Sequence, residues 1–359
     1  MLPTPKGSAA PRDRVPEVDL LRFIAASSVV IYHLTYLPRL QGKVSTIAFG
    51  GLQDISRFGY LGVNLFFIIS GFVILWSSHG RTPAEFVASR IARLYPSLWI
   101  CVLLTSAVLA AAGRTAEVSP RIIALNLTMV PGILGAPYVD GVYWTLFVEL
   151  KFYVLVFAVL LLRLMDRIEM VLASWLACCA AGALGLTPHW VDSLAMAPFG
   201  PYFISGCIIY MIRSRGASVV RVAALALSCV LGTLVAIDQQ EGFMKSTTPG
   251  SAAVVVCAII AFHAIFLAVA LRPRILPDSR VWYLLGTLTY PLYLLHNQIG
   301  KVVLGVALQF STLWGALAIA LIVIYALAWV VAAVSERRFS KQLHRTLLRF
   351  TSPTRASAP

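Results

Sequence analysis

The sequence is poor in charged residues. Asp, Glu, Lys and Arg make up 12% of its 359 residues, whereas 59% are hydrophobic. A soluble domain usually contains about 25% charged residues. With a mean hydropathy of +0.83, the chain has too few polar side chains to cover a soluble fold. The composition therefore excludes a soluble globular protein and predicts one continuous membrane domain.

Acidic residues are particularly scarce. The chain has 15 Asp and Glu against 29 Lys and Arg, which gives a formal net charge of +14. The basic residues are distributed over short loops and the C-terminal tail and do not cluster in a polar domain. This distribution argues against a nucleic-acid-binding protein and is typical of the positive-inside bias of membrane proteins.

Paired cysteines and metal-ligand spacings are also lacking. All the cysteines lie in apolar stretches, without a CxxC motif or a Cys/His spacing. We therefore expect small buried side chains, no disulfide framework and no metal site. Nor does a cleaved signal peptide fit the N-terminus, because residues 1–17 are polar and no cleavage site follows the first apolar run.

Long apolar runs, in contrast, are abundant. A membrane span needs about 20 mostly apolar residues, and ten segments qualify. They are residues 18–38, 60–78, 94–112, 144–164, 169–187, 195–212, 219–237, 251–271, 282–300 and 314–334. Residues 121–138 are apolar but interrupted by Pro and Gly, which favours an interfacial or re-entrant segment. The predicted fold is an all-α polytopic bundle.

The basic residues give this bundle an orientation. With a cytoplasmic N-terminus, the inner segments hold 20 Lys and Arg residues and the outer loops hold 7. An odd number of spans would spoil this alternation, so ten spans and two cytoplasmic termini are expected. We divide the chain into a cytoplasmic segment (1–17), a membrane domain (18–338) and a basic, partly disordered tail (339–359).

Ionisable residues inside spans are candidates for function, because they are costly in a bilayer. Arg22 and His33 in the first span are separated by three helical turns, so they share a face and lie about 16 Å apart. An arginine near the inner mouth suits an anionic group, and a histidine suits proton transfer or transient acylation. Alternatively, Arg22 reaches lipid headgroups and His33 is a satisfied core residue.

Residues 59–95 contribute further candidates. Ser70 lies among small residues that allow close helix packing, although its hydroxyl could also line a substrate path. Arg90 and Arg93 are spaced so that both can face one phosphate-bearing ligand, and Tyr95 follows them. Membrane anchoring is the alternative for the two arginines.

Two later spans hold polar groups. Glu149 has no local partner, since Lys151 points about 200° away; it would orient an imidazole, take a proton or form a structural ion pair. Tyr290, Tyr293 and His296 form a polar stripe on one helix face, which usually lines a cavity. His263 has no other polar residues on its helix face and is expected to be a packing residue.

These segments resemble the acyltransferase-3 family of membrane acyltransferases. The resemblance rests on the Arg22–His33 pair and on FFIISGF (66–72), RIARLYP (90–96), YWTLFVELKFY (143–153) and LGTLTYPLYLLH (285–296), with Glu336 at the end of the last span. It extends over roughly residues 17–338 and is greatest to the short, exopolysaccharide-modifying members.

The resemblance implies a bacterial inner-membrane enzyme that takes an acyl group from cytoplasmic acyl-CoA, with acetyl-CoA as the expected donor. The acceptor would be a hydroxyl of a carbohydrate or glycolipid. His33 would be the catalytic histidine with Arg22 as its motif partner and Glu149 as the acidic residue. Arg90 and Arg93 would hold the phosphates of the coenzyme.

Two other classes of protein fit the composition. A multi-pass transporter of an anionic glycolipid or metabolite would need no coenzyme. The second alternative is a non-catalytic membrane sensor or assembly partner. Binding of coenzyme A discriminates these alternatives from the enzyme. The acceptor, the acyl group, the choice between an acyl-histidine and direct transfer, and the oligomeric state stay open at this point.

Overall fold

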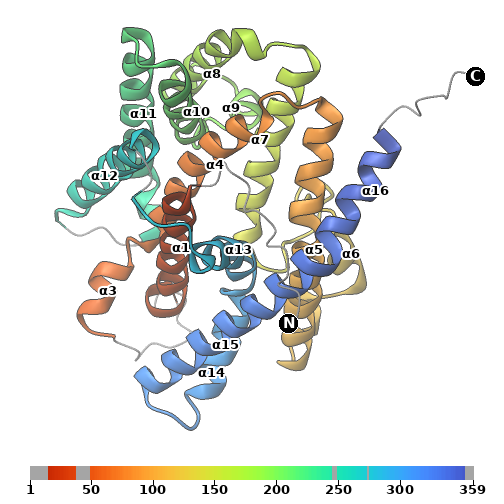
Figure 1. Cartoon of the computed structure of the whole chain (residues 1–359). Coiled ribbons are helices and arrows are strands. Elements are labelled where there is room, and N and C mark those ends of the chain that lie inside the picture. Colours follow the sequence, from red (N-terminus) through yellow and green to blue (C-terminus); the bar gives the residue numbers. More distant parts are fainter. Residues whose placement is uncertain (1–14, 38–48, 245–248, 273–274, 352–359) are drawn as a thin grey trace, which may run out of the picture.

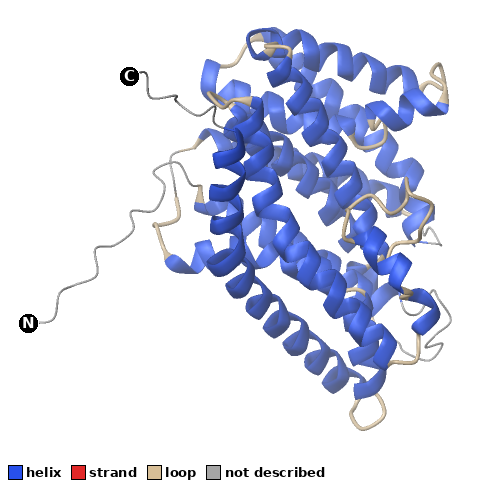
Figure 2. Ribbon diagram, turned by 90° about the vertical axis from the view of Figure 1, so that its right-hand side faces the viewer, coloured by secondary structure: helices blue, strands red, loops and turns tan. Residues whose placement is uncertain are grey.

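The computed structural model describes residues 15–37, 49–244, 249–272 and 275–351 (Figure 1). Over these residues the regular elements are helices joined by loops (Figure 2). The first half contains α1 (Pro16–Ile31), η1 (Tyr32–Tyr36), α3 (Gly51–Ser56), η2 (Gly59–Leu61), α4 (Gly62–Ser78), α5 (Pro83–Ala111), η3 (Thr115–Glu117), α6 (Pro120–Asn126), η4 (Gly141–Tyr143) and α7 (Trp144–Leu161). The second half contains η5 (Met165–Arg167), α8 (Ile168–Ala183), α9 (His189–Ala195), α10 (Gly200–Arg215), α11 (Val219–Met244), α12 (Ser251–Leu271), α13 (Arg280–Leu295), α14 (Gln298–Ala307), α15 (Leu313–Val334), η6 (Ser335–Ser340) and α16 (Lys341–Thr351).

The all-α membrane bundle is confirmed, and eight helical segments of the described chain are long and apolar enough to cross a bilayer. They coincide with eight of the ten predicted spans. At the other two positions, 169–187 and 282–300, lie α8 and α13, which have 16 residues each. Both fall short of the roughly 20 residues of a full span. The prediction of ten full-length spans is therefore confirmed for eight, and two shorter helices take the remaining places.

Local sequence signals determine where several helices begin. The predicted span 94–112 is part of a longer helix, because α5 already starts at Pro83. Thr82 accepts a hydrogen bond from the Glu85 backbone, and the Glu85 side chain accepts one from the Thr82 backbone. This capping box satisfies two backbone N–H groups at the helix start. The apolar segment 121–138 contains only the short helix α6 followed by a loop, in line with the predicted break.

The core packs most tightly between α4 and α10, where glycines bring the two backbones together. A Cβ atom on Gly71 would lie 2.1 Å from the carbonyl oxygen of Phe203, and one on Gly206 would lie 1.9 Å from that of Ile68. Gly62 approaches α1 in the same way, with Ala25 O at 2.5 Å from its Cβ position. The prediction that Gly62 and Gly71 permit close helix contacts is therefore confirmed.

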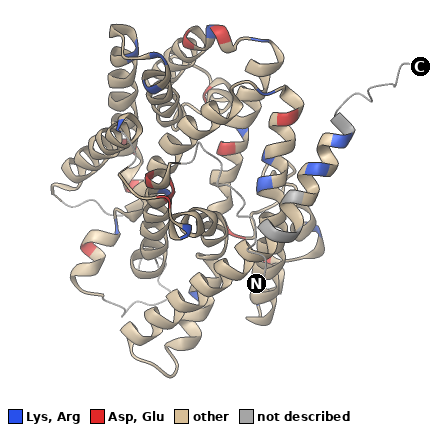
Figure 3. Ribbon diagram, viewed as in Figure 1, with Lys and Arg blue, Asp and Glu red and all other residues tan. Residues whose placement is uncertain are grey.

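The outer helices expose apolar side chains. Large hydrophobic residues on α11, α12 and α15 are more than a third exposed, among them Val222, Leu234, Ile260 and Ile322. Figure 3 shows long stretches of ribbon without charged residues. In a bundle of this composition such faces contact lipid. Cys178 on α8 and Cys257 on α12 are exposed, so the expectation that every cysteine is buried is wrong for these two.

The first part of the predicted tail (339–359) is helical, because residues 341–351 form α16, which packs against α5. Residues 1–14 and 352–359 lie outside the described residues.

Candidate active site

A cavity of about 920 Å³ opens where several helix ends meet. Its walls come from the start of α1, the end of α4, the first half of α5, the middle of α13 and the end of α15. The charged or titratable side chains among its lining residues are Asp19, Arg22, His79, Arg81, Arg90, Arg93, Tyr210, Tyr290 and His344. We call this space the basic cavity, because four arginines face a single carboxylate in it. Its volume is near the upper end of the range of about 300–1,000 Å³ for ligand sites.

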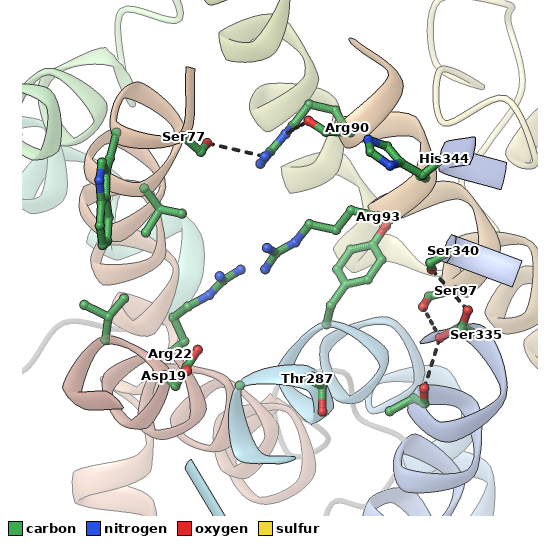
Figure 4. Close-up of a pocket in the computed structure, with 18 of the residues that line it drawn as sticks. Asp19, Arg22, Ser77, Arg90, Arg93, Ser97, Thr287, Ser335, Ser340 and His344 are labelled. Carbon is green, nitrogen blue, oxygen red and sulfur yellow. Dashed lines mark hydrogen bonds between the residues drawn. The ribbon is translucent and has the colours of Figure 1, made fainter. Parts of the chain in front are cut away.

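The arginines of the basic cavity approach one another (Figure 4). The guanidinium groups of Arg22 and Arg93 point into the cavity from opposite walls, and their charges repel. Arg90 is 9% exposed and donates a hydrogen bond to Ser77 Oγ at 3.3 Å. Like charges that converge in a partly buried space favour an anionic ligand, and guanidinium groups suit phosphates in particular. The structure thus brings the predicted Arg22, Arg90 and Arg93 to one site.

Two polar atoms at the basic cavity have no hydrogen-bond partner among the described residues. Arg22 Nε and the hydroxyl of Tyr290 are buried, and neither makes a hydrogen bond to any residue that the structure describes. Buried polar groups are nearly always satisfied. Unsatisfied donors beside a large cavity are typical of a site that forms hydrogen bonds to a polar ligand.

Glu149 connects the basic cavity to the core. Its Oε1 accepts hydrogen bonds from Ser70 Oγ at 3.1 Å and from Tyr153 Oη at 2.6 Å. Its charge also attracts Arg22 and Arg90. No hydrogen bond between described residues joins Glu149 to His33, so a role of this carboxylate in orienting the imidazole stays a prediction. Glu149 offsets the positive charge of the cavity.

His33 is paired with a second histidine. Its Nδ1 lies 2.9 Å from Val29 O and 3.2 Å from Nε2 of His296, while Nδ1 of His296 lies 2.7 Å from Tyr293 O. The two rings meet edge to face, 4.8 Å apart. His33 belongs to η1, a π-helical turn, and such turns often occur at functional sites.

The hydrogen bonds around the two histidines determine which nitrogen carries the proton. Since a carbonyl oxygen only accepts, His296 Nδ1 must be protonated, which leaves its Nε2 as the acceptor when the ring is neutral. His33 Nδ1 must then donate, toward both Val29 O and His296. In the neutral pair, His33 Nε2 therefore carries a lone pair, and no residue in the described part of the chain forms a hydrogen bond with it. The arrangement leaves a base or nucleophile available at this atom.

Asp140, which the sequence analysis did not single out, anchors the segment after His296. The fully buried carboxylate accepts hydrogen bonds from Asn297 Nδ2 at 2.7 Å, from the Gln298 backbone N–H at 2.9 Å and from the Val142 backbone N–H at 3.1 Å. It thereby joins η4 to the start of α14. The only signal in the sequence was its position before a Gly, which is typical of a turn.

The other predicted site residues have structural roles in this conformation. Tyr95 donates to Thr128 O at 3.2 Å and is not among the lining residues of the basic cavity, so its assignment to the substrate-binding residues stays a prediction. Tyr293 accepts a hydrogen bond from Thr145 Oγ1 at 2.9 Å. His263 is buried, with its ring nitrogens at Ile259 O and Ser205 Oγ, so its expected packing role is confirmed.

Comparison with known proteins identifies the domain. A family model described as an acyltransferase domain matches residues 15–333. The chain belongs to the acyltransferase-3 family. That match includes α1, η1, α5, α7 and α13, so both the basic cavity and the histidine pair lie almost entirely within the family domain. The protein is accordingly a multi-pass membrane acyltransferase.

Curated relatives cover much of the chain. The exopolysaccharide production protein ExoZ of Rhizobium meliloti (strain 1021) is 29% identical over 67% of this chain and 76% of its own length. The putative membrane-bound transacylase BcsY of Komagataeibacter xylinus is 25% identical over 80% and 73%. The acyltransferase MdmB of Streptomyces mycarofaciens is 24% identical over 87% of both chains. No solved structure matches the chain.

Proposed function

We propose that this acyltransferase moves an acyl group from cytoplasmic acyl-CoA to a hydroxyl group of a carbohydrate, and that this acyl group is acetyl. The observation that carries the donor assignment is the basic cavity with its converging arginines. Coenzyme A has a phosphate-rich end and a long uncharged arm that ends in the thioester. A cavity lined by Arg22, Arg90 and Arg93 suits the phosphates.

The distribution of charge supports a cytoplasmic opening for this cavity. Its walls are formed by helix ends that the positive-inside bias assigns to the cytoplasm, including the start of α1 and the loop that carries Arg81. The protein would then take its donor from the cytoplasm and be located in the bacterial inner membrane. The Rhizobium relative is an exopolysaccharide production protein, which favours a carbohydrate acceptor.

The chemistry would take place at His33. Tyr290 lines the basic cavity, and His296 lies at the end of the same helix, six residues and about 9 Å further along its axis. The uncharged arm of the donor would pass Tyr290 and bring the thioester to His33 Nε2. That nitrogen either removes the proton of the acceptor hydroxyl while the hydroxyl oxygen attacks the carbonyl carbon, or attacks that carbon itself. In the second route the acceptor hydroxyl then attacks the acyl-histidine, loses its proton and releases the imidazole. In both routes the thiolate of coenzyme A leaves and takes a proton.

His296 would support either route. When His33 gains a proton or an acyl group at Nε2, its ring becomes cationic, and the lone pair of His296 Nε2 stabilises the N–H that remains at Nδ1. This is the logic of a catalytic triad in which a neutral imidazole orients the base. Glu149 would stabilise the arginines that bind the donor.

Binding of coenzyme A to the purified protein tests the donor assignment. We expect saturable binding by isothermal titration calorimetry in detergent. Replacing Arg90 and Arg93 by Ala should weaken that binding at least tenfold, since each removes a hydrogen-bonding cation. Arg163→Ala is the matched control, because this arginine is not among the residues that line the basic cavity. Wild-type protein that does not bind coenzyme A would overturn the donor assignment.

A further inference from the structure

The C-terminal end of the described chain completes the basic cavity. Ser335 and Ser340 of η6 and His344 of α16 are among its lining residues (Figure 4). The match to the family domain ends at residue 333. Part of one wall of the cavity therefore lies beyond the residues matched by the family model.

This wall is attached to the helix that carries the donor-site arginines. Ser97 on α5 donates a hydrogen bond to Ser335 Oγ at 2.9 Å, and Ser340 Oγ donates to Ser335 O at 3.1 Å. α16 then packs along α5, and Figure 1 shows the two helices side by side. These contacts hold α16 in register with Arg90 and Arg93.

One face of α16 is half-buried against the protein and the other is exposed. Leu347 and Leu348 are half-buried, whereas Arg345 and Arg349 are exposed. His344 is also half-buried, and it lies three and four residues before the two leucines, so it shares their face. The helix thus presents an imidazole to the cavity and its arginines to the surroundings.

We propose that α16 is part of the donor site and that His344 binds the phosphate-bearing end of acyl-CoA. An imidazole donates a hydrogen bond in both its neutral and its protonated form. Beside converging guanidinium groups, such a donor adds a directed contact to a phosphate that the arginines attract. The inference rests on the proposed function, since it assumes acyl-CoA as the donor.

The test compares His344→Ala with Arg345→Ala in the full-length protein. Arg345 neighbours His344 on the same helix but is exposed, so its removal controls for a change in α16 itself. Adenosine 3′,5′-bisphosphate, which carries the 3′-phosphate and the first 5′-phosphate of coenzyme A without the thioester arm, is the binding probe. Transfer kinetics with acetyl-CoA are measured in parallel.

His344→Ala should raise both the Kd for the probe and the KM for acetyl-CoA about tenfold, as for the loss of one charge-assisted hydrogen bond. kcat should stay at the wild-type value, Arg345→Ala should behave like wild type, and His344→Gln, which keeps an N–H donor, should recover part of the affinity. Unchanged Kd and KM in His344→Ala, or a loss in kcat alone, would overturn the role of His344. Wild-type protein that binds neither coenzyme A nor the probe would instead overturn the donor assignment itself.

Discussion

The contact between α4 and α10 makes a quantitative prediction possible. In Gly206→Ala, the new Cβ atom would lie 1.9 Å from Ile68 O and 2.7 Å from Phe72 N. Ordinary contacts of a Cβ atom begin at 3.4 Å, so the two backbones would have to move apart by about 1.5 Å. Both neighbours are main-chain atoms, which cannot rotate away as a side chain would.

Overpacking of a core by one methyl group typically costs about 1–3 kcal/mol. Because the obstacle here is backbone, we expect a value near the upper end, about 3 kcal/mol. The matched control is Gly305→Ala in α14, where a Cβ atom meets no other atom within 4 Å. That substitution should be neutral or stabilise the helix by up to about 1 kcal/mol.

The assay is thermal unfolding of both variants in detergent, followed by the loss of the monodisperse peak in size-exclusion chromatography. Gly206→Ala should unfold well below wild type and Gly305→Ala at or slightly above it. Activity should also fall in Gly206→Ala, since α4 carries Ser70, which is hydrogen-bonded to Glu149. If both variants have the same stability as wild type, the close approach of α4 and α10 is refuted.

Three further predictions concern the site. His296→Leu should lower kcat about 10²-fold or more, as for the loss of a group that supports general base catalysis. In His296→Gln the amide oxygen can accept a hydrogen bond from His33, so this variant should recover part of the lost kcat. Equal activity of the two variants would contradict the hydrogen-bonded pair. Asp140→Ala leaves three buried donors without an acceptor and should lower thermal stability by about 3 kcal/mol or more, and a variant as stable as wild type would contradict the anchor. Tyr153→Phe removes one hydrogen bond from Glu149 and should raise the KM for the donor several-fold while leaving kcat within about twofold. Steady-state kinetics with varied acetyl-CoA measure both constants. A fall in kcat alone would argue against a role of Tyr153 in donor binding.

The sequence was most informative where a signal is local. Apolar runs located eight full spans, and the i, i+3 spacing of Arg90 and Arg93 correctly predicted that both face one site. The predicted spans at 169–187 and 282–300 coincide with helices, but each predicted segment is longer than its helix. α13 ends at Leu295, and Asn297 and Gln298 begin a new segment that is anchored to Asp140. An apolar window does not reveal such a break.

Contacts between distant residues could not be predicted from patterns. His33 and His296 are 263 positions apart, so no periodicity relates them. For Glu149 the sequence left open whether it orients an imidazole, takes a proton or forms a structural pair, because its hydrogen bond to Ser70 and its attraction to Arg22 and Arg90 join different helices. His344 was overlooked because it follows the last span, where a basic tail is the usual interpretation.

The most direct test of the central claim is acyl transfer by His33. Membranes that contain the wild-type protein or His33→Ala are supplied with radiolabelled acetyl-CoA, and label in the carbohydrate fraction is measured. His263→Ala is the control, because this buried histidine packs against Ser205, away from the basic cavity. We expect label with wild type, clear transfer with His263→Ala and none above background with His33→Ala. Equal labelling by wild type and His33→Ala would contradict the account.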